Sequence, residues 1–420
     1  MDFTGFNLHP KVVAGIEAAG FTTPTPIQVE AIPHVMAGRD VLGLAQTGTG
    51  KTAAFALPIL NRLAGGPRGK VRALIIAPTR ELAEQIHTDI TTLGAKTGLR
   101  SLTIYGGVGI NPQISRLRSG VDIVVACPGR LLDHLGQGTI NLGQIEVLVL
   151  DEADQMFDMG FFPDIRRILK ALPVQRQSLL FSATMPNEIR KLVHEVLQNP
   201  VTVQVSSGTP PATVSHALYP VEPQRKTALL LALLERTDTE SVLVFTRTKH
   251  RAKSLGRQLE NSGYKAASLQ GNLSQNKRQE ALDGFRSGRF QILVATDIAA
   301  RGIDVSRISH VINYDIPATP EAYVHRIGRT GRATRTGDAF TLVGSEDAVQ
   351  VRAIERTLGS VLQRRTLDSF NYSGPALDPR EFARDPKPRR PISRKNAGGG
   401  VQPQRRSQTR MTLAGTNKRG

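Results

Sequence analysis

The chain has 420 residues, which at about 150 residues per domain predicts two or three domains. Its 54 Lys and Arg residues exceed its 36 Asp and Glu residues, and the resulting net charge of +18 makes nucleic acid the first partner to consider. The single cysteine, Cys127, excludes an intramolecular disulfide framework and a cysteine-rich zinc site, and no apolar run is long enough to span a bilayer, so we expect a cytoplasmic protein that does not cross a membrane.

Short apolar runs recur along the chain, separated by helical patterns. Runs that are apolar throughout are typical of strands buried on both faces of a parallel sheet that is covered by helices. The expected strands are residues 71–77, 121–126, 145–150, 178–181, 242–245, 291–295, 310–314 and 339–343. An α/β fold is therefore predicted.

Composition divides the chain into four parts. Residues 206–217 include a Gly/Pro/Ser/Thr cluster without periodicity, which indicates a linker. It separates an N-terminal domain, residues 1–205, from a C-terminal domain, residues 218–365. We expect the remaining residues, 366–420, to form a flexible basic tail, because residues 376–420 contain 12 Lys and Arg residues but only 3 Asp and Glu residues.

Each expected domain contains a strand, a short polar loop and a helix at a comparable place. These segments are VLGLAQTGTGKTAAF, residues 41–55, and VLVFTRTKHRAKSL, residues 242–255. Only the first has a Gly-Lys-Thr sequence, so we expect two similar folds with one nucleotide site.

The segment AQTGTGKT, residues 45–52, is a candidate phosphate-binding loop. Gly48 and Gly50 allow backbone N–H groups to surround phosphates, Lys51 reaches the β- and γ-phosphates, and the Thr52 hydroxyl is a ligand for Mg²⁺. Ala45 stands where such loops usually begin with glycine, and a plain Gly-rich turn is the competing interpretation.

A second candidate site follows the expected strand at residues 145–150, in the sequence IEVLVLDEAD. Asp151 is placed to hold Mg²⁺ through water, and Glu152 to orient or deprotonate an attacking water. A solvated acidic turn is the alternative. A phosphate loop about 100 residues upstream favours the catalytic interpretation.

The letters DEAD stand at residues 151–154, and the sequence resembles the DEAD-box ATP-dependent RNA helicases over about residues 1–360. The segment VHRIGRTGRA and the basic tail are most similar to the bacterial RhlE-type branch. The resemblance implies two tandem RecA-like domains, with ATP and Mg²⁺ as cofactors. It further implies RNA-stimulated ATP hydrolysis coupled to sequence-independent unwinding of short RNA duplexes.

For ATP binding, the resemblance identifies GFTTPTPIQ, residues 20–28, as the family's Q motif. The Gln28 amide offers a donor and an acceptor to the adenine edge, and Phe21 lies against the adenine face. Phe3 is the upstream aromatic of the motif, although packing on the domain explains it nearly as well. Further expected ATP contacts are Ala45, Gln46, Thr47, Gly48, Thr49, Gly50, Lys51, Thr52 and Asp304.

Two further motifs imply catalysis and coupling. The Ser182-Ala183-Thr184 segment is expected to bond to Asp154 and connect hydrolysis to strand separation, and a strand-end turn is its alternative. In YVHRIGRTGR, residues 323–332, the resemblance makes Arg329 and Arg332 the arginine fingers, and His325 and Arg326 coupling residues. A basic helix end on the surface is the plainer interpretation of that segment.

The expected RNA contacts combine Gly, Thr and Arg at loops and helix starts. Backbone N–H, hydroxyl and guanidinium groups all donate to phosphate, so recognition should be independent of sequence, with 2′-hydroxyl contacts favouring RNA over DNA. Cys127 stands where the family usually has Thr, which puts one phosphate hydrogen bond in doubt. The contacts are Pro78, Thr79, Arg80, Gly106, Gly107, Pro128, Gly129, Arg130, Thr246, Arg247, Gln270, Gly271, Arg278 and Thr296.

Other functions compete with a helicase. The basic tail alone could anneal RNA without catalysis, and a nucleic-acid ATPase could clamp RNA without unwinding it or act on DNA. Ribosomal precursors and RNA-decay proteins are both conceivable partners, and the sequence does not choose between them.

Overall fold

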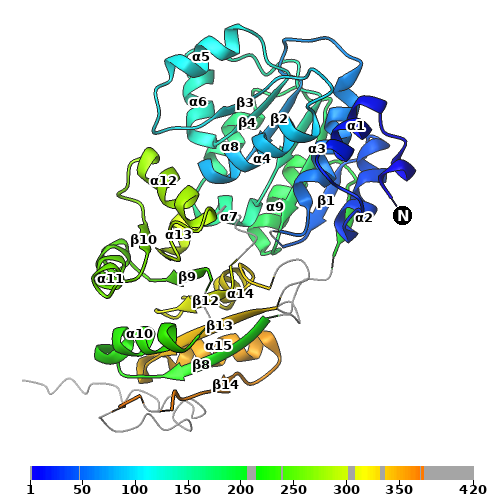
Figure 1. Ribbon diagram of the computed structural model, residues 1–420. Helices are drawn as coiled ribbons and strands as arrows, with labels where there is room; N and C mark the ends of the chain where they lie inside the picture. The colour runs from blue at the N-terminus through cyan, green and yellow to red at the C-terminus, as the bar shows by residue number, and fades with distance from the viewer. Residues whose placement is uncertain are drawn as a thin grey trace, which may run out of the picture. The chain divides into compact units, whose positions relative to one another are not determined.

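The computed structural model describes residues 2–46, 48–205, 214–237, 240–300, 308–331, 336–368 and 370–372. These residues form two seven-stranded sheets that belong to the same structural unit of the chain (Figure 1). Every strand pairing in the described part of the chain is parallel. The predicted α/β fold with parallel sheets is confirmed.

The first sheet contains all four strands predicted in the N-terminal half, together with β1 and two edge strands. The edge strands β3 and β7 escaped the prediction because their side chains alternate between buried and partly exposed. The order is β3 (Ser101–Ile104), β4 (Ile123–Ala126), β2 (Ala73–Ile76), β5 (Val147–Leu150), β6 (Gln177–Ser182), β1 (Val41–Leu44) and β7 (Val201–Gln204).

Helices cover both faces of this sheet (Figure 1), and successive strand residues enter opposite cores. Ile75 packs on the α1–α4 side, whereas its neighbours Leu74 and Ile76 pack on the α6–α9 side. One face carries α1 (Pro10–Ala18), α2 (Pro26–Met36), α3 (Lys51–Ala64) and α4 (Arg80–Leu93). The other carries α6 (Pro128–Gly136), α7 (Ala153–Asp158), α8 (Phe162–Leu169) and α9 (Asn187–Val196), and α5 (Asn111–Arg118) contacts β3.

The second sheet is built in the same way. Its order is β10 (Ala266–Leu269), β11 (Ile292–Ala295), β9 (Val242–Phe245), β12 (His310–Asn313), β13 (Gly337–Val343), β8 (Val214–Pro220) and β14 (Gln363–Arg364). One core includes α10 (Lys226–Arg236) and α11 (Lys249–Asn261). The other includes α12 (Gln275–Arg286), α13 (Asp297–Ala300), α14 (Pro320–Ile327) and α15 (Ala348–Leu358). Short 3₁₀ turns are η1 (Phe3–Phe6), η2 (Pro223–Arg225) and η3 (Ser345–Asp347).

The structure moves two of the expected domain boundaries. Residues 214–217, assigned to the linker, lie in β8, and the rest of that linker falls outside the described residues. The first residues of the expected tail pack on the second sheet through Leu367, Phe370 and Tyr372. The tail from residue 373 onward also lies outside the described residues.

Strand order corrects the comparison between the two halves. β1 occupies the sixth place in its sheet, and the sixth place in the second sheet belongs to β8. β9, which the sequence suggested as the counterpart of β1, occupies the third place and so corresponds to β2. All these segments have an apolar strand followed by a polar loop. Because this pattern is local, it does not indicate which place a strand takes in its sheet. Among the described residues, no helix is long and apolar enough to cross a membrane.

Candidate functional site

The phosphate loop connects β1 to α3, and its glycines have backbone angles that favour glycine. Gly48 and Gly50 have φ of 86° and 93°, and a Cβ atom on Gly50 would lie 2.5 Å from Nε2 of Gln28. Lys51 begins α3 and is buried, with Nζ donating to the Ala45 carbonyl at 3.0 Å. Backbone N–H groups at the start of this 14-residue helix suit a phosphate.

Ala45 replaces the usual first glycine without strain. Its side chain is fully buried in the core beneath the loop, and its N–H donates to the Ser182 carbonyl at 3.1 Å. Thr49 closes the loop by donating its hydroxyl to the Gln46 carbonyl at 2.8 Å, whereas Thr47 lies outside the described residues.

Two buried carboxylates lie at the carboxyl end of β5, and one of them faces Lys51. Asp151 and Glu152 are each 2% exposed, and a carboxylate oxygen of Asp151 lies 3.9 Å from Lys51 Nζ. Burial raises the pKa of Asp151, and the nearby Lys51 ammonium opposes that rise. Glu152 has a left-handed backbone with φ 55°, an unfavourable geometry that the surrounding structure holds in place. The Asp151 carboxylate and the Thr52 hydroxyl are oxygen donors of the kind that fit Mg²⁺.

Gln28 connects the Q motif to the phosphate loop. Its Oε1 accepts from the Thr25 N–H at 3.0 Å, and its Nε2 donates to the Gly50 carbonyl at 3.0 Å. An amide oxygen has a second lone pair and an amide nitrogen a second proton, so each end retains capacity for a base edge.

The two aromatic residues of this region differ in exposure. Phe3 is 4% exposed and its ring centroid lies 6.4 Å from that of Phe21, whereas Phe21 is 42% exposed. Phe21 therefore presents a ring face to a ligand, and Phe3 supports it from the core. This geometry favours the packing interpretation of Phe3.

Asp154 forms hydrogen bonds with the segment at the end of β6 that was expected to contact it. Its Oδ2 accepts from the Thr184 hydroxyl at 3.2 Å and from the backbone N–H groups of Ala183 and Thr184 at 3.2 and 3.1 Å. Ser182 does not reach Asp154, because its hydroxyl donates to the Thr184 carbonyl at 2.7 Å and shapes the turn.

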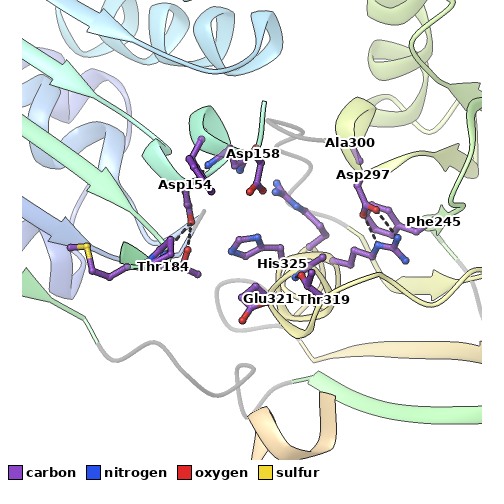
Figure 2. Close-up of a pocket in the computed structure, with 16 residues that line it drawn as sticks. Asp154, Asp158, Thr184, Phe245, Asp297, Ala300, Thr319, Glu321 and His325 are labelled. Carbon is purple, nitrogen blue, oxygen red and sulfur yellow. Dashed lines mark hydrogen bonds and ion pairs between the residues drawn. The ribbon is translucent and has the colours of Figure 1, made fainter. Parts of the chain in front are cut away.

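A cavity of 490 Å³ lies beside Asp154 and Thr184 and is lined by residues of both halves, including His325 and Arg329 of the second. In Figure 2 the His325 imidazole extends into the cavity toward Asp154 and Thr184. Burial lowers the pKa of His325, while the Asp154 carboxylate acts in the opposite direction. Four of the expected coupling residues, Asp154, Thr184, His325 and Arg326, therefore line one cavity, and Ser182 does not.

Arg326 is mainly a structural anchor. It is 3% exposed, its Nη2 donates to Asp297 at 2.7 Å, and its Nη1 donates to the Asn313 side chain at 3.1 Å and to the Asp315 carbonyl at 2.7 Å. Its guanidinium also lies 4.9 Å from the centroid of the Phe245 ring. These contacts fix the start of the arginine segment, and nothing in the sequence indicated Asp297 or Asn313 as partners.

Of the other expected groups in the second half, Arg329 lines the cavity and is 6% exposed. Arg332 and Asp304 lie outside the described residues.

A second cavity, of 400 Å³, gathers most of the expected RNA contacts from both halves. Arg80 and Arg278 line it and already have partners: Arg80 donates to Gln275 at 3.0 Å, and Arg278 lies 2.7 Å from Glu81. The expected contacts that line it are Pro78, Thr79, Arg80, Gly106, Gly129, Arg130, Gly271 and Arg278.

The remaining expected RNA residues differ in accessibility. Thr246 and Gln270 are buried, at 0% and 3% exposure, so their side chains support loops and do not face solvent. Arg247 is exposed, Thr296 is half-buried, and Pro128 is buried at the start of α6. Gly107 has φ 80°, and a Cβ atom there would lie 2.1 Å from the Arg80 guanidinium.

Sequence reasoning missed a buried pair that connects two RNA motifs. Gln113 donates to the Tyr105 carbonyl at 3.0 Å, and its Oε1 lies 3.0 Å from Nε2 of His134 and 3.4 Å from Arg130. Because that oxygen only accepts, Nε2 of His134 carries the proton. Burial lowers the pKa of His134, and Arg130 lowers it further. A lone amide and a lone imidazole on amphipathic helices have no motif that could have revealed this contact.

Cys127 precedes α6 and is 9% exposed. Burial raises the pKa of its thiol to about 12, with the Glu81 carboxylate adding to the rise. The thiol is therefore neutral and unactivated.

The comparisons with known proteins agree with this geometry. A family model described as DEAD/DEAH box helicase matches residues 25–192, and one described as Helicase conserved C-terminal domain matches residues 225–334. The chain is 44% identical over 362 residues to the ATP-dependent RNA helicase CshA of Listeria monocytogenes, covering 86% of this chain and 69% of the relative. It is 44% identical over 363 residues to RhlB of Xanthomonas oryzae, covering 84% and 63%.

Solved structures give the same result. Dbp5 of S. cerevisiae bound to RNA and ADP BeF3 is 32% identical, with a TM-score of 0.79 over 87% of this chain and 96% of that one. A DEAD box protein from Methanococcus jannaschii is 37% identical, with a TM-score of 0.52 over 88% and 99%. With 44% identity to relatives of which it covers two thirds or more, and with both halves matched by family models, the chain belongs to the DEAD-box ATP-dependent RNA helicases.

Proposed function

We propose that this chain hydrolyses ATP when RNA is bound and uses the cycle to open short RNA duplexes without reading their sequence. The observation that carries the proposal is the cavity that joins Asp154 and Thr184 of the first half to His325 and Arg329 of the second. A cavity lined from both halves allows each half to respond to what the other binds. In this proposal residues 1–205 bind the nucleotide and residues 218–365 supply the arginines.

The phosphate chain of ATP lies on the loop N–H groups, with Lys51 against the β- and γ-phosphates. The oxygen of a water molecule attacks the γ-phosphorus while Glu152 accepts a proton from that water. ADP leaves with the bridging oxygen. Arg329 and Arg332 neutralise charge on the transferred group. Mg²⁺, held through Asp151 and Thr52, neutralises charge on the phosphates when it is bound.

RNA recognition is proposed to rest on the backbone of the strand. The groups that line the second cavity are guanidinium, hydroxyl and glycine N–H, none of which needs a base edge. Opening four or five base pairs costs on the order of 6 kcal/mol at about 1.4 kcal/mol per step, the DNA stacking value. Short duplexes are therefore within reach of one cycle, and long ones are not.

ATP turnover measured without nucleic acid, with RNA and with DNA, beside displacement of a short RNA duplex, tests the proposal. RNA should stimulate turnover, and ATP should drive displacement. Glu152→Gln should keep ATP and RNA binding and lose nearly all turnover. Turnover at the wild-type rate in that variant would remove Glu152 from the mechanism, and RNA-stimulated turnover without displacement would favour an RNA clamp.

We propose a cytoplasmic protein of the RhlE-type branch, with ribosomal precursors or RNA-decay proteins as partners. RNA annealing by residues 366–420 alone, without ATP, would support the annealing alternative.

A further inference from the structure

A third groove, with a volume of 650 Å³, lies wholly within the second half, between α11 and the turn that leads into α12. In Figure 1, α11 and α12 lie on either side of β10, and both contact that strand. Gly256 brings α11 close to the strand, because a Cβ atom there would lie 3.2 Å from Cβ of Ser268. Two lining residues belong to the RNA segments expected from the sequence, Gln270 and Lys249, the last residue of FTRTK (residues 245–249). Lys253, Arg257 and Lys277 belong to none of those segments.

The groove is strongly basic. Lys249, Lys253 and Arg257 recur every four residues on one face of α11, about 6 Å apart along the helix axis, and Lys277 faces them from α12. Glu260 is the one acidic residue among those that line the groove. Lys253, Arg257 and Lys277 are exposed, and none of them forms an ion pair with another described residue.

The start of α12 adds a second attraction for anions. Ser274 caps this 12-residue helix and lines the groove, so the positive end of the helix dipole lies beside the lysines. The lining includes no Phe, Tyr or Trp, which leaves no surface for extended base stacking. This chemistry suits a phosphodiester backbone.

The groove also continues the cavity that gathers the RNA motifs. Leu273 lines both, and the adjoining residues Gly271 and Asn272 line one each. A strand leaving the RNA motifs past this turn would meet the α11 face next. Resting on the proposed function, we propose that the α11–α12 groove is an additional binding site for the RNA backbone that lengthens the RNA footprint of the second half.

The test compares two full-length variants that lose the same number of positive charges from the same half. Lys253→Gln with Arg257→Gln removes two from the groove, and Lys265→Gln with Arg356→Gln removes two exposed ones elsewhere. Affinity for a labelled 20-nucleotide single-stranded RNA is measured across a salt series, with melting temperature as the check on folding. The groove variant should bind about tenfold more weakly at 0.1 M salt, and its log–log salt slope should be shallower by about 1.4, at 0.7 per phosphate contact.

The control should stay close to wild type, and Lys253→Arg with Arg257→Lys should keep the affinity because it keeps the charges. Equal affinity and slope in the groove and control variants, with wild-type RNA binding intact, would overturn the groove proposal alone. Absence of RNA binding in the wild-type chain would overturn the proposed function, and the groove proposal with it.

Discussion

In each half a Lys-Thr pair begins the helix that follows the sixth strand of the sheet, but only the pair in the first half follows a glycine loop of the kind that suits a phosphate. Lys51 and Thr52 are the first two residues of α3, which comes after β1. Lys226 and Thr227 are the first two residues of α10, which comes after β8. Both lysines are buried beside a carboxylate, with Lys226 3.6 Å from Asp347. Both halves therefore have a buried lysine beside a carboxylate at the same helix start.

The loops before these helices account for the difference. Before Lys51 the chain has two glycines with positive φ, whereas before Lys226 it reads VEPQR and winds into the 3₁₀ turn Pro223–Arg225. Proline has no N–H to offer, and the turn occupies the helix start. The Thr227 hydroxyl is already within 2.9 Å of the Tyr314 hydroxyl. A lysine at a helix start therefore serves a phosphate only when the loop before it can curl around one.

The largest effect is expected from a substitution that tests whether the second half contributes to ATP hydrolysis through its arginines and not through a phosphate loop. Arg329→Ala should lower RNA-stimulated ATP turnover about 10³-fold, the lower end of the range for arginine fingers, because transition-state charge loses its partner. Steady-state turnover and ATP affinity are measured together, with Arg356→Ala as an exposed control. Equal losses in affinity and turnover would instead make Arg329 a ground-state ligand.

The next effect concerns the working loop. Lys51→Ala should lower turnover by at least about 10²-fold, the typical loss when one donor to developing charge is removed. It should also weaken ATP binding, since Lys51 is expected to contact the bound phosphates. Near-normal turnover in this variant would mean that the loop of the first half does not hold the phosphates.

The counterpart in the second half should change stability and leave the chemistry alone. Lys226→Ala removes the ammonium partner of the buried Asp347 and leaves it the Gly344 N–H and the Arg247 guanidinium, 4.0 Å away. The unfolding free energy should therefore fall, by less than the about 3–5 kcal/mol typical of a buried charge left with no partner. Denaturant unfolding measures the loss, and a second change, Asp347→Asn, should recover part of it. ATP turnover per folded molecule should stay near wild type, and a catalytic defect as large as that of Lys51→Ala would contradict the comparison.

A third helix start, at Cys127 before α6, predicts the smallest effect. With the thiol pKa raised to about 12, the group stays protonated at neutral pH, and only about one thiol in 10⁴ is the reactive thiolate at pH 8. Iodoacetamide should therefore label the native chain far more slowly than the denatured chain, and native labelling should keep rising with pH toward 12. Labelling that levels off near pH 8 would indicate an accessible, unshifted thiol.

Much of the candidate nucleotide site could be predicted from the sequence, because its groups are close together along the chain. Gly48, Gly50 and Lys51 lie within four residues, and their chemistry depends on a local turn. Asp151 and Glu152 follow an apolar run whose length and composition identified β5. The central strands were equally clear, since burial on both faces leaves them apolar throughout.

The tertiary structure decided what depends on strand order and on distant contacts. Edge strands β3 and β7 alternate in burial, and the true counterpart of β1 appeared only when β8 took the sixth place of its sheet. The partners of Arg326, at Asp297 and Asn313, come from other strand ends, and no local pattern specifies them. The sequence by itself determined which groups are candidates to hold a nucleotide, because that chemistry is local. The fold decided which groups meet across the sheets, because packing brings together residues that are far apart along the chain.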